Sequence, residues 1–514
     1  MRTKYSFYNF LVSLITSVAL PIFGFIKVRM FIDLYGSDLN GLQLTIMNVI
    51  TFLNVFELSY SLAFRQLLFK PLAENDRDRV LSIYNGAVKV FRFTGMAVLI
   101  VGALTALLFP MFAESPLGYG ETVTMFLILC VPFGLSYFLM GPNFVIIADQ
   151  KEYKINIWIQ TIAILRMVLM VGVILMKLPY IYIFLIEGLQ VFIANFIARR
   201  IALKNYPWLK ENKQLPYDDA FQKNAKYTII QRLSTLATNN TDNLVITFFM
   251  GYTMTSVYGS YSYLTESVSK IINSAITSPI NSFGNLFNDS GADSYSVFTE
   301  FFNFAVYIAS IIGVCIFVVI GRFVLIWMKM RPEYSVTILI AFLFAINIFY
   351  MTMREPIIIC RDANGLFKDA KNNAYLLAIS KVVLSIVLIQ PLGIAGVLAA
   401  TMLTNWTVDF LYNPVLVYKK VFHLNPLRYY KMVFTRLGVA ILIGAAAYAG
   451  WQTQQAFVTS STLHFLMGCV VLGLIVFVVF TIVYWFSYAS FRKLIQRGWR
   501  LIRHKMNKNK EVQA

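Results

Sequence analysis

The chain has 514 residues, of which 58% are hydrophobic and only 13% are charged. Soluble globular proteins carry about 25% charged residues, so this composition excludes an ordinary water-soluble protein and indicates that lipid surrounds most of the chain. The formal net charge is +19. Because the basic residues fall mostly between apolar segments, this charge indicates membrane topology and contact with anionic membrane lipids, and we expect no nucleic-acid partner.

The residues that usually carry catalysis or bind metals are sparse. The 4 cysteines stand far apart without a CxxC pair, and the 3 histidines fall near predicted helix ends or in the tail. The sequence also has no GxxxxGK[ST] phosphate loop and no HExxH or GxSxG motif. We therefore predict a protein that is not an enzyme and that holds no metal and no cofactor. A membrane-embedded glycosyltransferase or polymerase remains the alternative from another functional class.

Apolar segments long enough to cross a bilayer recur along the whole chain and predict an all-α polytopic membrane protein with about fourteen transmembrane helices. The first of them is predicted to be an uncleaved helix and not a signal peptide. The predicted helices lie near 8–30, 41–69, 88–112, 122–147, 157–177, 179–198, 227–250, 256–280, 299–328, 335–358, 373–391, 393–418, 431–451 and 463–488.

The distribution of Lys and Arg predicts the orientation of these helices. If the N-terminus is cytoplasmic, the inner segments carry most basic residues, whereas the outer loops near 113–121, 250–256 and 452–462 carry none. This alternation predicts that both termini are cytoplasmic. Bases assigned to or beside inner segments include Arg354, Arg361 and Arg436. Exceptions are Lys27, Arg29, Arg322, Lys329 and Arg331 at predicted outer ends, and the acidic inner loop 281–298.

The basic stretch 199–226 predicts how the chain is divided. It is interpreted as a cytoplasmic linker between an N-terminal lobe, 1–198, and a C-terminal lobe, 227–420, each with about six helices. Both lobes begin with a helix whose end places a Phe-rich apolar turn before a glycine, "KVRMFIDLYG" and "NLVITFFMGYTMTSVYG". An even number of helices per lobe predicts parallel repeats with a substrate path between them. Two further helices, 421–491, and a basic cytoplasmic tail, 492–514, follow.

Polar residues recur at helical spacing in three predicted helices, which places them on one face of each helix. Helix 41–69 carries Thr51, Asn54, Glu57, Ser61 and Arg65. Helix 227–250 carries Gln231, Thr235, either Thr238 or Asn239, and Asp242, and Arg232 stands near its inner end. Helix 256–280 carries Gly259, Ser262, Glu266, Lys270, Asn273 and Thr277. Isolated charges inside other helices are Arg166, Glu187, Lys381 and Asp409.

These polar faces have two interpretations. Intramembrane charges are costly and usually face a cavity or a partner, which predicts a water-filled central cavity. Alternatively, the side chains form interhelical hydrogen bonds that fix the packing. For Glu266 and Lys270, whose i,i+4 order favours pairing, a structural salt bridge and a substrate contact both stay open.

Four features resemble one family of transporters. They are the six-plus-six-plus-two layout, "NNTDNLVITFFMG" followed by "VYGSYSYL", "RMFIDLYG" at the end of the first helix, and "PLGIAGVLAATMLTNW". With these features the chain resembles the Wzx-type polysaccharide flippases of the MATE-like superfamily, which export lipid-linked saccharide repeat units. The resemblance covers most of the chain. The acidic loop 281–298 departs from the basic loops expected at that place.

The resemblance implies a function, a site and a location. The protein would move an undecaprenyl-diphosphate-linked oligosaccharide from the cytoplasmic to the outer leaflet of a bacterial cytoplasmic membrane by alternating access, for surface polysaccharide biosynthesis. Its partners would be that lipid, membrane lipids and a polysaccharide polymerase complex. The expected bases of a cationic cavity are Arg29, Arg166, Arg232 and Lys270. Expected coupling or polar residues are Asn54, Glu57, Asn239, Asp242, Glu266 and Asn273, with H⁺ or Na⁺ as the coupling ion.

Two alternatives share this fold. A cation-coupled multidrug antiporter would have an acidic, aromatic cavity and mostly about twelve helices, which the several candidate bases argue against. A flippase for cell-wall precursors would differ only in its cargo.

Overall fold

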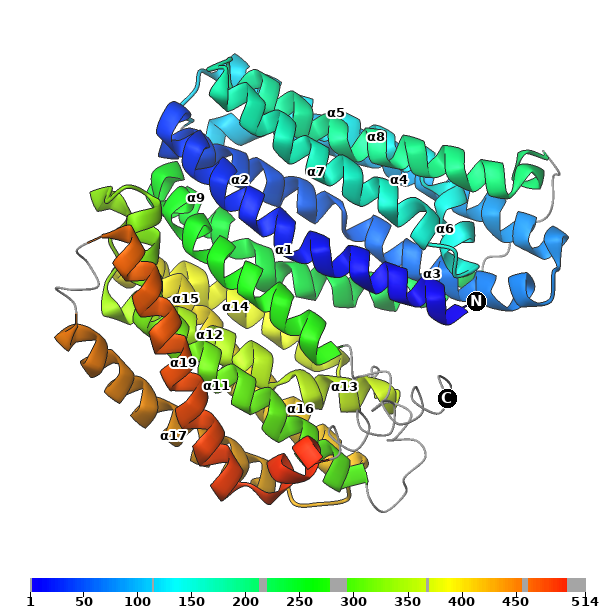
Figure 1. Cartoon of the computed structure of the whole chain (residues 1–514). Helices are drawn as coiled ribbons and strands as arrows, with labels where there is room; N and C mark the ends of the chain where they lie inside the picture. Colours follow the sequence, from blue (N-terminus) through cyan, green and yellow to red (C-terminus); the bar gives the residue numbers. More distant parts are fainter. Residues whose placement is uncertain are drawn as a thin grey trace, which may run out of the picture. The chain divides into compact units, whose positions relative to one another are not determined.

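The computed structural model describes residues 2–112, 115–211, 220–277, 294–366, 369–454 and 461–496, and the secondary structure of this part is entirely helical (Figure 1). Ten helices of the described part are long and apolar enough to cross a membrane. Each predicted transmembrane segment coincides with one helix, with part of a long helix, or with a broken helix. The prediction of an all-α polytopic membrane protein is therefore confirmed.

The chain forms two compact units, which we call unit 1, Met1–Ser260, and unit 2, Tyr261–Ala514. The first part of helix α9 belongs to unit 1 by its contacts, so the unit boundary lies beyond the predicted linker 199–226. The division into two six-helix lobes related by a repeat stays a prediction.

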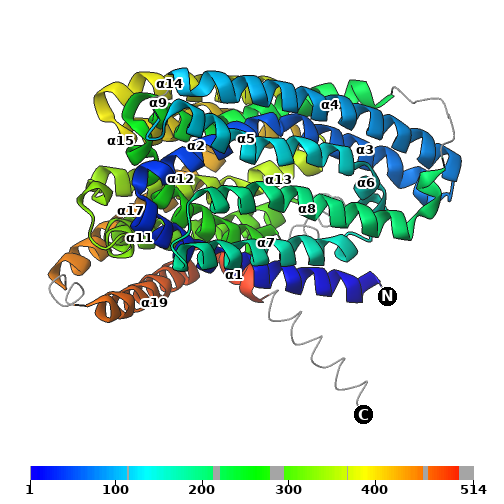
Figure 2. The same ribbon diagram turned by 90° about the horizontal axis from the view of Figure 1, so that it is seen from above.

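Unit 1 is built on helices that pack side by side. Helix α5 packs against α4 and α8, and α7 packs against α8 and α1 (Figure 2). Its core holds Phe91 and Phe144, whose ring centroids lie 4.8 Å apart. The helices of unit 1 are α1 (Arg2–Tyr35), α2 (Ser37–Leu53), α3 (Val55–Ala73), α4 (Arg77–Phe112), α5 (Tyr119–Ser136), η1 (Tyr137–Leu139), α6 (Gly141–Ala148), α7 (Tyr153–Leu175), α8 (Ile181–Asn205), η2 (Pro207–Lys210) and the first part of α9 (Ala220–Thr277).

In unit 2, α11 packs against α12, α17 and α19, and α14 packs against α15. An aromatic cluster that includes Phe298, Tyr418 and Tyr429 fills the core beside α11. The helices of unit 2 after α9 are α11 (Ser294–Trp327), η4 (Pro332–Tyr334), α12 (Ile338–Met353), α13 (Glu355–Ala363), α14 (Lys371–Leu392), α15 (Ile394–Thr404), η5 (Asn405–Asp409), α16 (Phe410–Lys420), α17 (Leu427–Thr453) and α19 (Thr462–Ser487).

Several predicted helices are interrupted. Segment 41–69 breaks at Asn54, between α2 and α3, so its polar face does not run along one straight helix. Pro142 and Pro356 stand in the first turns of α6 and α13, where the missing N–H is tolerated and a new helix can begin. Segment 393–418 contains a single π-helical turn, η5, which ends at Asp409. Such turns are frequent at functional sites.

Two glycines with positive φ form corners in the helical chain, and each follows one of the two similar Phe-rich segments noted in the sequence. Gly36 separates α1 from α2 with φ 92° and ψ 165°, and Gly251 kinks α9 with φ 83° and ψ 178°. Residues with a Cβ rarely adopt these angles, so glycine is required at both corners. Gly41 is required for another reason: a Cβ there would lie 1.9 Å from the carbonyl oxygen of Tyr252. Helices α2 and α9 therefore touch backbone to backbone within unit 1.

Candidate functional site

A polar cluster joins α1, α2, α7 and α8 in unit 1. Lys27 Nζ donates a hydrogen bond to Gln43 Oε1 at 3.0 Å. Gln43 Nε2 in turn donates to Glu187 Oε2 at 3.1 Å. Arg166 forms an ion pair with the other carboxylate oxygen of Glu187. We call these four residues the N-unit charge cluster.

The N-unit charge cluster is largely buried and carries unequal charge. Lys27 is 8% exposed and Gln43 is 4% exposed, and the side chains of Arg166 and Glu187 are 20% and 11% exposed. The cluster sets two cations against one carboxylate, which leaves an excess positive charge at intramembrane positions. Charges held there usually serve a ligand, an ion pathway or a partner residue. The chemistry suits an anionic group that would pair with Lys27 and Arg166.

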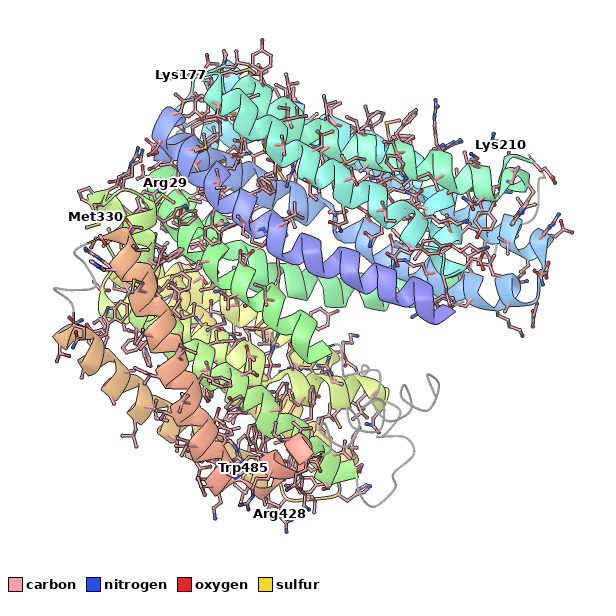
Figure 3. The ribbon with its side chains drawn as sticks, viewed as in Figure 1. Arg29, Lys177, Lys210, Met330, Arg428 and Trp485 are labelled. Atoms are coloured by element: carbon pink, nitrogen blue, oxygen red, sulfur yellow. The ribbon has the colours of Figure 1, made fainter. Side chains whose placement is uncertain are left out.

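The sequence identified only part of this cluster. Arg166 and Glu187 were noted as separate charges, and the structure places them together. Lys27 and Gln43 were missed as site residues, although Lys27 stood out as a base at a predicted outer helix end. Arg29, which the sequence predicted as a base of the cationic cavity, is half-buried on α1 (Figure 3). It forms no hydrogen bond or ion pair with any described residue.

A second set of polar side chains lies where α2 meets α9. Asn40 donates to Ser256 Oγ at 2.8 Å. Thr247 Oγ1 lies 2.7 Å from Thr45 Oγ1 and 2.8 Å from Thr255 Oγ1. These buried hydroxyl groups satisfy one another across the close contact of the two helices. None of these residues belongs to the predicted polar faces, and their contacts are of the kind that fixes the packing of neighbouring helices.

The predicted polar residues of unit 1 are not all gathered at one place. Asp242 is 7% exposed and accepts a hydrogen bond from the Tyr258 hydroxyl at 2.7 Å, within α9. Asn54 accepts a hydrogen bond from the Tyr137 hydroxyl at 3.1 Å. Glu57 is half-buried on α3. Within the part of the chain that the structure describes, none of these three residues forms a hydrogen bond with the N-unit charge cluster.

The remaining predicted residues lie on α9. Glu266 and Lys270 are exposed and belong to unit 2. The backbones of Arg232, Asn239 and Asn273 are helical, but their side chains lie outside the described part of the structure.

Unit 2 contains its own buried cluster around Asp409, which we call the C-unit charge cluster. Asp409 is 3% exposed and forms a salt bridge with Arg354 at 3.2 Å. Its carboxylate also accepts hydrogen bonds from the Tyr350 hydroxyl at 2.8 Å and from Asn413 at 2.5 Å. Sequence reasoning had treated Arg354 as a base of an inner segment. The π-helical turn that presents Asp409 to this residue has no sequence signal that we recognised.

Two further buried bases of unit 2 are held by protein acceptors. Lys381 is fully buried and donates to the carbonyl oxygen of Val397 at 3.2 Å. Arg436 is 5% exposed and donates to Asn303 Oδ1 at 2.7 Å. Its guanidinium lies 4.2 Å from the centre of the Tyr488 ring, in cation–π geometry. These contacts indicate that both bases stabilise helix packing in unit 2.

Comparison with known proteins identifies the fold. No family model matches the chain, and no curated protein matches its sequence. The lipid II flippase MurJ in an inward closed conformation matches with a TM-score of 0.65 and 15% identity, over 92% of this chain and 99% of that chain. An inward-facing multidrug resistance MATE family transporter of the MOP superfamily matches with a TM-score of 0.53 and 13% identity, over 79% of this chain and 98% of that chain.

A mutant of the Vibrio cholerae MATE transporter VcmN matches equally well, with a TM-score of 0.53 and 13% identity, over 82% of this chain and 98% of that chain. At these identities the comparisons establish the fold. The chain is a multi-pass membrane protein with the fold shared by the lipid II flippase MurJ and these MATE transporters.

Proposed function

We propose that this protein is a flippase that moves a lipid-linked oligosaccharide diphosphate from the cytoplasmic to the outer leaflet by alternating access. The observation that carries the proposal is the N-unit charge cluster of unit 1, in which Arg166 pairs with the single carboxylate of Glu187 and Lys27 is linked to that carboxylate through Gln43. A MOP-type fold with an intramembrane excess of positive charge suits an anionic cargo better than a cationic drug.

The proposed roles follow from the contacts. Arg166 is the more exposed of the two bases and can offer its remaining N–H groups to phosphate oxygens. Glu187 holds Arg166, and through Gln43 it also holds Lys27, so the bases are positioned before cargo arrives. Arg29, half-buried on the same helix as Lys27, would add to the positive potential at the outer end of the path. The diphosphate would compete with Glu187 for the bases and leave when the unit changes conformation.

An apolar groove of unit 2 supports a lipid cargo. It has a volume of about 280 Å³ and lies among α11, α12 and α17, with Phe317, Phe342 and Tyr448 among its lining residues. The lining contains almost no polar atom, which suits an isoprenoid chain and no sugar. We propose that this groove of unit 2 binds part of an isoprenoid chain.

The proposal also includes the membrane in which the protein acts, its partner complex and the ion that drives transport. The protein would act in a bacterial cytoplasmic membrane with both termini in the cytoplasm, beside a polysaccharide polymerase complex. It needs no cofactor, and either H⁺ or Na⁺ would drive the cycle, with Glu57 and Asp242 as candidate coupling acids. Surface polysaccharide biosynthesis would consume the exported unit.

The test uses cells in which the gene is deleted and replaced by variants. In the deletion strain, lipid-linked oligosaccharides accumulate and the surface polysaccharide disappears if the proposal is right. Arg166→Gln should reproduce this phenotype at normal membrane abundance, whereas Lys177→Gln, an exposed change at the α7–α8 turn, should not. Unchanged lipid-linked oligosaccharides in the deletion strain would refute the proposal.

The same experiment separates the alternatives. Accumulation of lipid-linked cell-wall precursor would identify that precursor as the cargo. Increased sensitivity to cationic drugs, with normal lipid-linked saccharides, would identify a multidrug exporter. Incorporation of sugar by the purified protein would identify a transferase or polymerase.

A further inference from the structure

A basic cavity lies in unit 1, apart from the N-unit charge cluster. Its volume is about 520 Å³, within the range of roughly 300–1,000 Å³ typical of small-ligand sites. We call it the α4–α8 cavity. Its lining residues are Tyr84, Asn85, Val88, Lys89, Arg92, Arg199, Leu203, Leu209, Lys210 and Glu211. Figure 3 labels Lys210 at the end of unit 1 opposite Arg29, so this cavity and Lys27 lie far apart along the helices.

Helical spacing explains how the charges converge. Asn85, Lys89 and Arg92 follow one another at i, i+4 and i+7, which places them on one face of α4. Helix α8 contributes Arg199 and η2 contributes Lys210, so three elements supply bases. Among the described lining residues Glu211 is the one acid, and four bases against this carboxylate leave an excess of positive charge.

Parts of the cavity wall are fixed before any ligand arrives. The guanidinium of Arg199 donates to the carbonyl oxygen of Phe138 at 2.9 Å, which orients it. The segment before η2 is anchored because the Tyr206 hydroxyl donates to Asp149, which also pairs with Lys151 at 2.5 Å. Burial, and then the hydrogen bond to Asp149, raise the pKa of Tyr206, so its hydroxyl stays a donor. A prearranged set of bases lowers the cost of binding an anion.

The apolar residues around the cavity indicate the depth at which it opens. Phe93, next to Arg92, is 77% exposed, and Met96 is 52% exposed. Trp208 of η2 lies beneath Arg77 at 6.0 Å in cation–π geometry. Exposed apolar side chains suit contact with lipid tails, and Trp and Tyr are enriched at the membrane–water interface. The cavity therefore lies where a membrane-spanning surface gives way to a basic end, at headgroup depth.

We propose that the α4–α8 cavity binds a phosphate ester, and that its source is the headgroup of an anionic phospholipid. Phosphate oxygens would accept hydrogen bonds from Lys89, Arg92 and Lys210, while the acyl chains would lie along the apolar surface of α4. The positive-inside pattern assigns this end of unit 1 to the cytoplasm, where basic cavities meet anionic lipid. The site does not depend on the flippase proposal, because it uses none of the residues of the N-unit charge cluster.

The test measures lipid retained by the full-length protein after purification and exchange into zwitterionic lipid. Phosphatidylglycerol is added back, and bound molecules are counted by native mass spectrometry. Lys89→Gln with Arg92→Gln should weaken retention roughly ten- to thirty-fold, because each base near an anionic headgroup contributes to binding. The control, Lys70→Gln with Lys419→Gln, removes the same charge from exposed positions and should retain phosphatidylglycerol normally. Lys89→Arg with Arg92→Lys should also retain it.

Inorganic pyrophosphate forms the second arm of the experiment. If it binds the wild type and not the Lys89/Arg92 glutamine variant, while lipid retention is equal in both, the cavity is a phosphate site for a soluble ligand. Equal retention of phosphatidylglycerol and equal pyrophosphate binding by the cavity variant and the wild type would overturn the proposal. Thermal unfolding in zwitterionic lipid must give the same midpoint for the Lys89/Arg92 glutamine variant and for the Lys70/Lys419 control. Equal midpoints exclude misfolding as the cause of weaker lipid retention.

Discussion

Lys27 Nζ lies 3.0 Å from Gln43 Oε1, and Gln43 Nε2 donates a hydrogen bond to Glu187, which forms an ion pair with Arg166. One carboxylate is therefore linked to two basic side chains, to Arg166 directly and to Lys27 through Gln43. An amide between a lysine and a glutamate can donate on one side and accept on the other, which Leu or Glu at position 43 could not do. This relay is the feature of unit 1 on which the proposed function depends.

Lys27→Met should abolish most export. It removes one of two cations and leaves Gln43 Oε1 without its donor. A hydrogen bond to a charged group contributes about 1.5–3 kcal/mol, so we expect the export rate to fall by roughly ten-fold or more. Lys27→Arg should restore part of it. Lipid-linked saccharide is quantified in complemented deletion cells, with Lys177→Gln as the exposed control. Wild-type export by Lys27→Met at equal abundance would contradict the assigned role.

Gly41→Ala should destabilise unit 1. The new Cβ would meet the Tyr252 carbonyl oxygen at 1.9 Å, so α2 and α9 would have to separate. Overpacking of this kind costs about 1–3 kcal/mol. Gly172→Ala on α7 is the matched control, because a Cβ there meets no atom within 4 Å and alanine favours helix by about 1 kcal/mol. Thermal unfolding of the purified proteins should show a lower midpoint only for Gly41→Ala.

Gly251→Ala should straighten or strain the corner of α9. Gly251 adopts φ 83° in open space, so alanine is disfavoured by backbone conformation and not by a clash. The expected cost is roughly 1–3 kcal/mol, because this extended conformation with positive φ is adopted almost only by glycine. Gly438→Ala, in a helix and also in open space, should be neutral or stabilising. Equal unfolding midpoints for the two variants would show that the corner does not need its glycine.

Asp409→Asn should destabilise unit 2 strongly. Arg354, whose side chain is 24% exposed, would lose the carboxylate of the buried Asp409. Breaking a fully buried pair costs about 3–5 kcal/mol, so the loss here should approach the lower end of this range. Asp369→Asn provides the comparison, because its pair with Lys420 is largely exposed and contributes about 0–1 kcal/mol. Arg354→Met combined with Asp409→Asn should recover part of the loss. A double variant as unstable as the sum of the single ones would argue against direct coupling of the two charges.

The sequence by itself determined the helical architecture. Length and apolarity predicted the membrane-spanning helices, because both depend on local composition and bilayer thickness. The sequence also showed a Phe-rich turn before a glycine in "MFIDLYG" and in "ITFFMG". These glycines are Gly36 and Gly251, which adopt positive φ in the structure. The prolines at the starts of α6 and α13 stand where two of the helix breaks occur, but those breaks and the π-helical turn before Asp409 were not predicted.

Only the tertiary structure decided which polar residues meet. Gln43 and Glu187 are 144 residues apart in the chain, and Arg354 and Asp409 are 55 apart. Helical periodicity fixes the face on which a residue stands, but the partner of that face depends on the packing of all helices in the unit. For this reason Arg166 and Glu187 were found as charges yet not as a pair, and Lys27 was found only as an exception to the topology.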